Sequence, residues 1–211
     1  MKIDCHVHTQ KFDKAGNLEQ LIDSFTGHGI KAFVSTDHFK ERYFRPGKAT
    51  LDDYWVPYYN AVEAASRKSI YVLPGAEVTV GNNDYLIYGM KPQEFIGLTK
   101  RQVLFPEFRK YVNAYGGLVV QAHPFRVKRG SFQHTVNLNI DGLEIENGHP
   151  KHKGNNDVAQ MLVRRFEMIG SRGSDAHSLD AIGMAYLDSE RDDDKAMVDF
   201  MMAWIQRIYK V

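Results

Sequence analysis

The chain has 211 residues, 43% of them hydrophobic and 25% charged, and its formal net charge is +1 with histidine neutral. This composition is that of an ordinary globular protein with one buried core, and the balanced charge excludes a large basic surface for nucleic acid. The one cysteine, Cys5, excludes an internal disulfide, and no apolar run approaches the roughly 20 residues that span a bilayer. We therefore expect a single domain over residues 1–211. Because the N-terminus also lacks the apolar core of a signal peptide, we expect this domain in the cytoplasm and outside any membrane.

Short apolar runs alternate with amphipathic stretches along the chain. Leu18, Leu21, Ile22 and Phe25 have the spacing of one helix face, and Gly29 suits the end of that helix. In chain order, the first half of this pattern predicts a strand over 2–7, a helix over 18–28, a strand over 32–36, a helix over 58–65, and strands over 70–73 and 84–88. Pro57 is expected in the first turn of the helix over 58–65. The second half predicts a helix over 105–115, strands over 118–122 and 140–145, a helix over 158–166, a short strand through 169, and a helix over 198–209.

Strands that alternate with helices indicate βα units and a parallel sheet. With about seven strands, the chain is compatible with an irregular β/α barrel or with an open doubly wound sheet. Barrels carry their active residues at the C-terminal ends of the strands, and the polar motifs of this chain fall at such ends. We therefore predict an α/β fold, an irregular (β/α)7 barrel of about seven strands that is like a TIM barrel.

The first polar motif ends the first predicted strand and reads Asp4-Cys5-His6-Val7-His8. Because side chains alternate along a strand, we expect Asp4, His6 and His8 to share one face. Two adjacent imidazoles suit Zn, Mn or Fe. The alternative is a pair of surface histidines near a terminus, and the carboxylate on the same face favours the metal site.

Two further motifs follow the second and third predicted strands. His38 stands directly after Asp37, and a histidine beside an acceptor is typical of an oriented metal ligand. Glu77 follows Gly75 at the next strand end, where the two oxygens of a carboxylate can bridge two metal ions. Taken alone, each of these residues fits a solvated loop position better than a metal site.

A histidine and an arginine follow the predicted strand over 118–122. His123 precedes Pro124, which disfavours the helical region and predicts an extended backbone at His123. Arg126 suits an anionic oxygen, since guanidinium forms two parallel hydrogen bonds with such groups. The alternative for Arg126 is a solvent-facing member of a basic stretch with Lys128 and Arg129.

The last motif repeats the spacing of the first, with Asp175 and His177 after a short apolar strand. Gly173 lets the backbone approach a neighbouring strand closely. Five ligand-like groups at five strand ends are hard to obtain by chance, and their convergence at one end of a sheet describes a hydrolytic metal centre.

These motifs, in this order, resemble those of the PHP (polymerase and histidinol phosphatase) superfamily, in particular its small metal-dependent phosphoesterase branch. The resemblance covers most of the chain, and the segment from Gly142 to Gly148 also resembles the segment before the last motif in that branch. The resemblance implies an irregular barrel that holds two or three divalent metal ions. The ligands it implies are His6, His8, Glu77 and Asp175 for the first metal, Glu77 and His123 for the second, and His38, His177 and Asp13 for the third.

One departure concerns the second metal. Many members of the superfamily carry a further histidine near the fourth strand, where this chain reads Asn82 to Tyr88, and no histidine lies between His38 and His123. The ligands that remain open for this position are His134, His149 and water.

The leading hypothesis is hydrolysis of a small phosphate ester. Glu77 would bridge two metals that lower the pKa of a bound water to give hydroxide near neutral pH. Arg126 would neutralise charge on the phosphate oxygens, and the proton for the leaving group would come from a metal-bound water or a nearby histidine. The candidate catalytic residues are Arg126 and His177.

Two alternatives keep the same metal centre. One is an amidohydrolase-type enzyme that cleaves a C–N bond or a lactone, and the other is a non-catalytic metal-binding PHP module. For the leading hypothesis the partner is a small phosphorylated molecule, and nucleic acid is expected only as a nucleotide or a short oligonucleotide substrate. The sequence leaves the substrate, the choice of monoester or diester, the identity and number of the metals, and the oligomeric state open.

Overall fold

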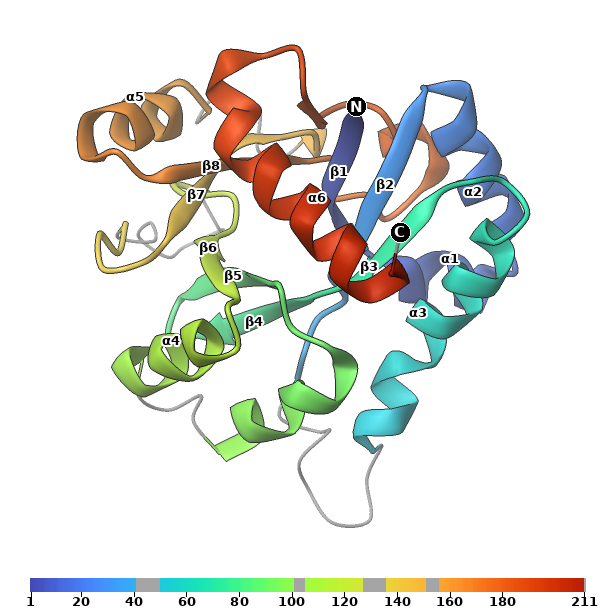
Figure 1. Ribbon diagram of the computed structural model, residues 1–211, viewed down its shortest axis with the longest axis horizontal. Helices are drawn as coiled ribbons and strands as arrows, with labels where there is room; N and C mark the ends of the chain where they lie inside the picture. The colour runs from blue at the N-terminus through green and yellow to red at the C-terminus, as the bar shows by residue number, and fades with distance from the viewer. Residues whose placement is uncertain (41–49, 101–104, 127–135, 151–155, 211) are drawn as a thin grey trace.

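The computed structural model describes residues 1–40, 50–100, 105–126, 136–150 and 156–210 (Figure 1). Its strands form two mixed sheets, with the orders β3-β2-β1-β9 and β4-β5-β6-β7-β8. The strands of the first sheet are β1 (Lys2–Val7), β2 (Ile30–Ser35), β3 (Tyr71–Pro74) and β9 (Leu187–Asp188). Those of the second sheet are β4 (Ala76–Val80), β5 (Asn83–Tyr88), β6 (Leu118–Gln121), β7 (Gly142–Asn147) and β8 (Ile169–Gly173).

The predicted TIM-barrel-like (β/α)7 barrel is wrong, because neither sheet closes on itself or on the other among the described residues. Among the described residues, two isolated bridges join segments of the two sheets, Val7 to Ala176 and His38 to Glu77. Three strand pairs are antiparallel: β1 with β9, β4 with β5, and β5 with β6. The protein is therefore an α/β fold with two mixed sheets, in which the βα alternation is interrupted.

The interruption has a local cause in the turn between β4 and β5. Val80 pairs with Asn83, so only Gly81 and Asn82 join the two strands, and Gly81 has a φ of 63°. A two-residue turn that starts with a positive φ connects antiparallel strands, whereas parallel strands require a long crossover. The chain therefore forms a hairpin at this point and not a parallel βα unit, and β4 is a strand that the apolar pattern did not predict.

Helices cover the outer faces of both sheets (Figure 1). The α-helices are α1 (Thr9–Ala15), α2 (Leu18–Gly27), α3 (Leu51–Ala65), α4 (Phe105–Ala114), α5 (Asn156–Phe166) and α6 (Lys195–Tyr209), and the 3₁₀ helices are η2 (Pro92–Lys100), η4 (Leu179–Ala181) and η5 (Asp192–Asp194). Helix α1 was not predicted. Helix α3 is longer than predicted, so Pro57 lies inside it rather than in its first turn.

Helix α3 starts earlier because Thr50 and Asp53 form a capping box. The Thr50 hydroxyl accepts the backbone N–H of Asp53, and the Asp53 carboxylate accepts the backbone N–H of Thr50. This reciprocal pair satisfies two N–H groups that a helix start leaves without a partner.

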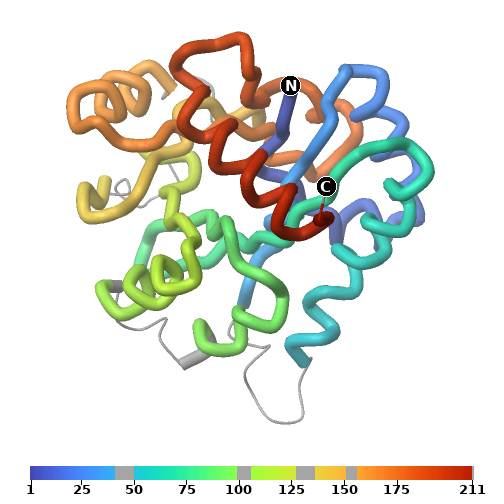
Figure 2. The backbone as a smooth tube through the Cα atoms, in the orientation of Figure 1, coloured from blue at the N-terminus to red at the C-terminus, as the bar shows by residue number. Residues whose placement is uncertain are grey.

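The buried apolar side chains form two clusters. One lies between the sheets and α6 and includes Ile3, Cys5, Leu86, Val120 and Trp204. In Figures 1 and 2 the C-terminal helix crosses in front of the N-terminal strands, which explains why its apolar face belongs to this cluster. The other cluster lies under the outer helices. No helix among the described residues has both the length and the apolarity needed to cross a membrane.

Candidate metal centre

The ligand-bearing end of β1 is irregular. Its pairing with β2 shifts between Asp4 and Val7, and the Asp4 carboxylate accepts the backbone N–H groups of His6 at 3.1 Å and Ser174 at 2.9 Å. That Asp4, His6 and His8 share one face by simple alternation stays a prediction at this irregular strand end. Asp4 connects β1 to Ser174, the residue after β8.

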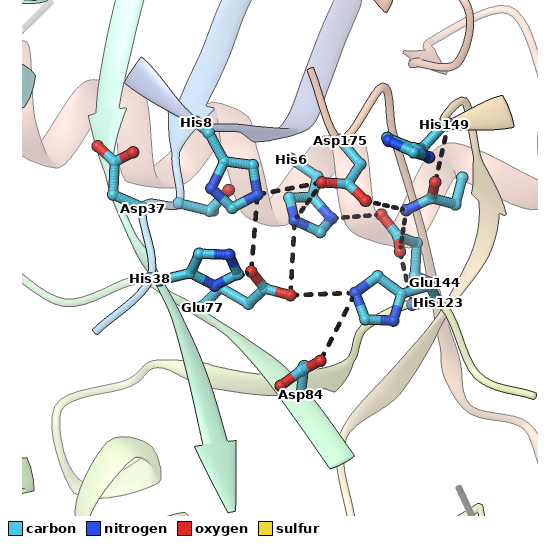
Figure 3. A network of polar contacts seen from close by, with 12 residues as sticks. His6, His8, Asp37, His38, Glu77, Asp84, His123, Glu144, His149 and Asp175 are labelled. Atoms are coloured by element: carbon cyan, nitrogen blue, oxygen red, sulfur yellow. Dashed lines mark hydrogen bonds and ion pairs between the residues drawn. The ribbon is translucent and has the colours of Figure 1, made fainter. Parts of the chain in front are cut away.

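His6 is fully buried and is oriented by a carboxylate on β7 (Figure 3). Its Nδ1 lies 2.9 Å from Oε1 of Glu144, so Nδ1 carries a proton and Nε2 is the nitrogen that a metal ion would bind in place of a second proton. Nε2 makes no hydrogen bond within the described part of the chain, and it lies 3.5 Å from Asp175 Oδ1 and 4.0 Å from Glu77 Oε1. A buried nitrogen without a hydrogen bond, surrounded by carboxylate oxygens, fits a metal ligand.

Glu77 lies at the centre of the histidines (Figure 3). Its Oε1 is 3.0 Å from His123 Nε2, and its Oε2 is 2.6 Å from His38 Nδ1 and 3.6 Å from His8 Nε2. It is part of β4 rather than the end of a strand, and it is only 2% exposed. A buried carboxylate with imidazoles beside both oxygens has the arrangement of a bridging ligand.

Asp175 and His177 approach the same cluster from the segment after β8. Asp175 Oδ1 is 3.0 Å from His8 Nε2, and the Nδ1 of His177 lies 2.9 Å from the backbone carbonyl oxygen of Asp175. Because a carbonyl only accepts, Nδ1 of His177 is the donor and Nε2 is left unprotonated for a ligand. The close approach predicted at Gly173 is also present, since a Cβ there would lie 2.4 Å from Cβ of His6.

His123 follows β6 in a strained backbone conformation. Its φ is 28°, so the residue is in the left-handed region and not extended as the following proline predicted. Its N–H donates to Glu144 Oε2 at 2.7 Å and its imidazole lies against Glu77, and these contacts hold the conformation. The NH1 group of Arg126 lies 3.3 Å from His123 Nε2, so the guanidinium borders the cluster.

Three overlapping groups of potential ligand atoms result, each with its atoms within 4.8 Å of one another. The groups are His8, His38 and His177; His6, His8 and Glu77; and Glu77, Asp84 and His123. The first includes the partly exposed His38 and His177, whereas the residues of the other two groups are buried. The site is therefore a row of adjacent positions that opens to solvent at the first group.

The charges in the cluster favour a cation. Burial alone would lower the pKa of His6, but the negative charges of Asp175 and Glu144 outweigh it and raise this pKa to about 10. Burial lowers the pKa of His8 to about 4. Burial would also raise the pKa of Glu77, but hydrogen bonds from His123 and His38 hold it well below its usual range. Before any ion binds, the cluster thus keeps an ionised carboxylate and attracts positive charge.

The predicted site residues are distributed as follows. His6, His8, His38, Glu77, His123 and His177 all belong to the three groups, and Asp175 lies against His8. Asp13 lies on α1, where its carboxylate accepts a hydrogen bond from Asn60 at 2.9 Å, and it is in none of the groups. His134, Lys128 and Arg129 lie outside the described residues.

His149 lies beside the row and not in it. Its ring centroid is 5.9 Å from that of His177, and both side chains line a cavity of about 270 Å³ with Gly148, Pro150 and Met184. None of the three ligand groups includes His149.

Sequence reasoning missed two buried carboxylates. Asp84 joins Glu77 and His123 in the third group, and Glu144 contacts both His6 and His123. The signal for Asp84 was the Gly81-Asn82 turn, because a two-residue hairpin brings Asp84 opposite Thr79 and onto the face that carries Glu77. Glu144 had no local signal, since its contact with His6 spans 138 residues of chain.

Comparison with known proteins gives a likeness of structure and none of sequence. No protein-family model matches the chain, and no curated protein does. A protein of Bifidobacterium adolescentis, provisionally named a metal-dependent phosphoesterase, aligns with a TM-score of 0.57 over 83% of this chain and 87% of its own, at 14% identity. A two-domain protein of Bacteroides vulgatus, described as containing a predicted PHP-like metal-dependent phosphoesterase, aligns with a TM-score of 0.60 over 84% of this chain, at 15% identity.

This chain spans 52% of the length of the Bacteroides vulgatus protein. At 14% and 15% identity these alignments establish a shared fold. The resemblance to PHP proteins that the motifs indicated is thus confirmed as a resemblance of fold.

Proposed function

We propose that the chain is a metal-dependent phosphoesterase of the PHP type that hydrolyses a small phosphate ester. The observation that carries the proposal is the row of three ligand groups, of which the first two share His8 and the last two share Glu77. Adjacent positions with a shared carboxylate are typical of hydrolases with two or more metals. The names of the two structural neighbours point in the same direction.

The residues present fit divalent ions. The nitrogen donor of His6 and the oxygen donors of Glu77 and Asp175 are buried side by side, and imidazole–carboxylate mixtures accept Zn, Mn and Fe. Bound divalent ions would supply Lewis acidity and a nucleophile at neutral pH. The protein's own contribution is to exclude water around His6 and Glu77 and to hold the donors in place.

Arg126 is the candidate for binding the phosphate group. Its side chain is 28% exposed, and its NH1 group lies 3.3 Å from His123, so the guanidinium stands at the boundary between the cluster and solvent. A guanidinium binds phosphate oxygens through two parallel hydrogen bonds and counteracts the negative charge that they carry.

His177 is the candidate for donating a proton to the leaving group. It is 34% exposed and stands at the open end of the row, where a product alcohol would depart. Burial lowers the pKa of this imidazole from its usual value, so the neutral form is favoured and His177 would have to accept a proton before it could pass one to the leaving group. This role is an alternative to metal binding by Nε2 of His177, because a metal-bound nitrogen carries no proton.

The test is a parallel assay of protein loaded with Zn²⁺, Mn²⁺ or Fe²⁺ against phosphomonoesters, phosphodiesters, amides and lactones. We expect turnover of a phosphoester, and at least a hundredfold loss (about 10²) in Asp175→Asn, because a two-metal site depends on each ligand. Asp199→Asn on the exposed face of α6 removes the same charge and is the matched control. Turnover of amides or lactones without phosphoester turnover would replace this proposal, as would full activity in Asp175→Asn.

A further inference from the structure

Asp84 faces the same side of the second sheet as Glu77. In the antiparallel pair of β4 and β5, Asp84 is opposite Thr79, and Leu86 is opposite Glu77. Side chains of directly opposed residues project from the same face, and residues two apart in a strand share that face. Asp84 is 6% exposed, so its carboxylate is buried beside the centre rather than solvated.

The orientation of the Asp84 carboxylate is fixed by Thr79 on the neighbouring strand β4. The Thr79 hydroxyl donates to Asp84 Oδ1 at 2.6 Å. The other oxygen, Oδ2, lies 4.0 Å from His123 Nε2, and this nitrogen is 3.0 Å from Glu77 Oε1 (Figure 3). Two carboxylates and one imidazole thus surround one position with their potential ligand atoms within 4.8 Å.

The three positions of the row differ in donor chemistry. The group of His8, His38 and His177 offers three imidazole nitrogens, whereas the group that contains Asp84 offers two carboxylates and one nitrogen. Imidazole donors suit Zn²⁺, and carboxylate oxygens suit Mn²⁺ and Mg²⁺. The two ends of the row therefore differ in the ion that they favour.

We propose that Asp84 is a metal ligand, with Glu77 and His123, and that it makes this position favour Mn²⁺ or Mg²⁺ over Zn²⁺ relative to the three-histidine position. The inference rests on the proposed metal centre. It adds one ligand to that centre and a difference between its positions in the ion that each favours. It also gives the second position a ligand other than His134, His149 or water.

An alternative to metal binding by Asp84 is an ion pair with Arg126. The NH1 group of Arg126 lies 3.9 Å from Asp84 Oδ2, so the guanidinium provides positive charge near the same carboxylate. If Arg126 alone compensates Asp84, no ion depends on Asp84 and its replacement leaves metal binding unchanged.

The experiment measures ion binding without any substrate. Metal-free wild-type protein, Asp84→Asn, Asp84→His and the control Asp199→Asn are titrated with Mn²⁺, and bound Mn²⁺ is measured by electron paramagnetic resonance and elemental analysis. The same proteins are then equilibrated with mixtures of Mn²⁺ and Zn²⁺. Asp84→Asn has the shape of the native side chain and retains an oxygen that accepts from Thr79, so its fold is expected to persist.

We expect Asp84→Asn to weaken binding of one Mn²⁺ by about 10- to 100-fold, as loss of support at a metal site does. Asp84→His should shift the ratio of bound Mn²⁺ to bound Zn²⁺ by at least about tenfold toward Zn²⁺. Asp199→Asn should match the wild type. Unchanged Mn²⁺ binding in Asp84→Asn, or an unchanged ratio in Asp84→His, would overturn the inference.

The outcome is separable from that of the proposed function. A wild-type protein that binds Mn²⁺ through Asp84 but cleaves no phosphoester would contradict the proposed function and leave this inference standing. A phosphoesterase whose Mn²⁺ binding is unaffected by Asp84→Asn would contradict this inference alone.

Discussion

Replacing Glu144 by glutamine should weaken metal binding although the side chain keeps its size. Glu144 is 1% exposed and uses both carboxylate oxygens as acceptors. Oε1 lies against Nδ1 of His6 at 2.9 Å, and Oε2 accepts the N–H of His123 at 2.7 Å and the amide of Asn147 at 2.9 Å. One side chain therefore orients two histidines that come from different sheets.

Glutamine has a single acceptor oxygen, so it cannot serve both sides. If its oxygen faces His123 and Asn147, its NH₂ group faces Nδ1 of His6 and favours the tautomer with the proton on Nε2. That tautomer removes the lone pair that would bind the metal. If the oxygen faces His6 instead, buried donors at His123 and Asn147 lose their acceptor, at a cost of about 1–3 kcal/mol each.

Either orientation removes an acceptor that supports His6 or His123. Loss of a carboxylate that supports a metal-bound histidine typically weakens metal affinity by about 10- to 100-fold, which is about 1.4–2.8 kcal/mol. The measurement is isothermal titration of metal-free Glu144→Gln with Zn²⁺ and Mn²⁺, with the exposed Glu190→Gln as matched control. Equal affinities for Glu144→Gln and wild type would refute the positioning role.

Three further predictions concern stability. Gly173→Ala should lower the free energy of unfolding by about 1–3 kcal/mol, because the new Cβ would lie 2.6 Å from a backbone nitrogen of β1. The control Gly27→Ala on α2, whose Cβ would meet no atom within 4 Å, should not lower this free energy in the same urea titration. Arg172→Met should cost about 3–5 kcal/mol, since Arg172 is the partner of the buried Asp194 at 2.6 Å, while the more exposed Arg191→Met should cost less than about 1 kcal/mol. Chelation of metals from the wild type should lower the melting temperature reversibly, because ions that bind only the native state stabilise it; an unchanged melting temperature would contradict a metal centre.

The sequence revealed the candidate ligands that are marked by local patterns. His6, His8, Asp175 and His177 stand two residues apart in pairs at the ends of apolar strands, and this spacing is readable without any tertiary knowledge. The structure places all four within one cluster. A pattern of this kind succeeds because strand periodicity and strand ends are local properties.

The sequence did not reveal the arrangement of the sheets. The barrel prediction rested on the alternation of strands and helices and on polar motifs at strand ends, and the Gly81-Asn82 turn interrupts that alternation with a hairpin. The same omission hid β4, and with it the fact that Glu77 and Asp84 are neighbours across two strands. Carboxylates within strands give no local sign of burial, so Asp84 and Glu144 become visible only when pairing is known.

The backbone at two ligand-bearing residues has a physical implication of its own. His123 has a φ of 28° and Asp175 a φ of 50°, and both residues follow the strands β6 and β8. Left-handed conformations at residues other than glycine cost about 1–3 kcal/mol each and persist only where the surroundings enforce them. At His123 the enforcing contact is the hydrogen bond to Glu144, the same carboxylate that orients His6. The buried Glu144 side chain therefore sets both the backbone conformation of His123 and the tautomer of His6. For this reason Glu144→Gln, which exchanges one oxygen for an NH₂ group, should affect candidate ligands from both sheets at once.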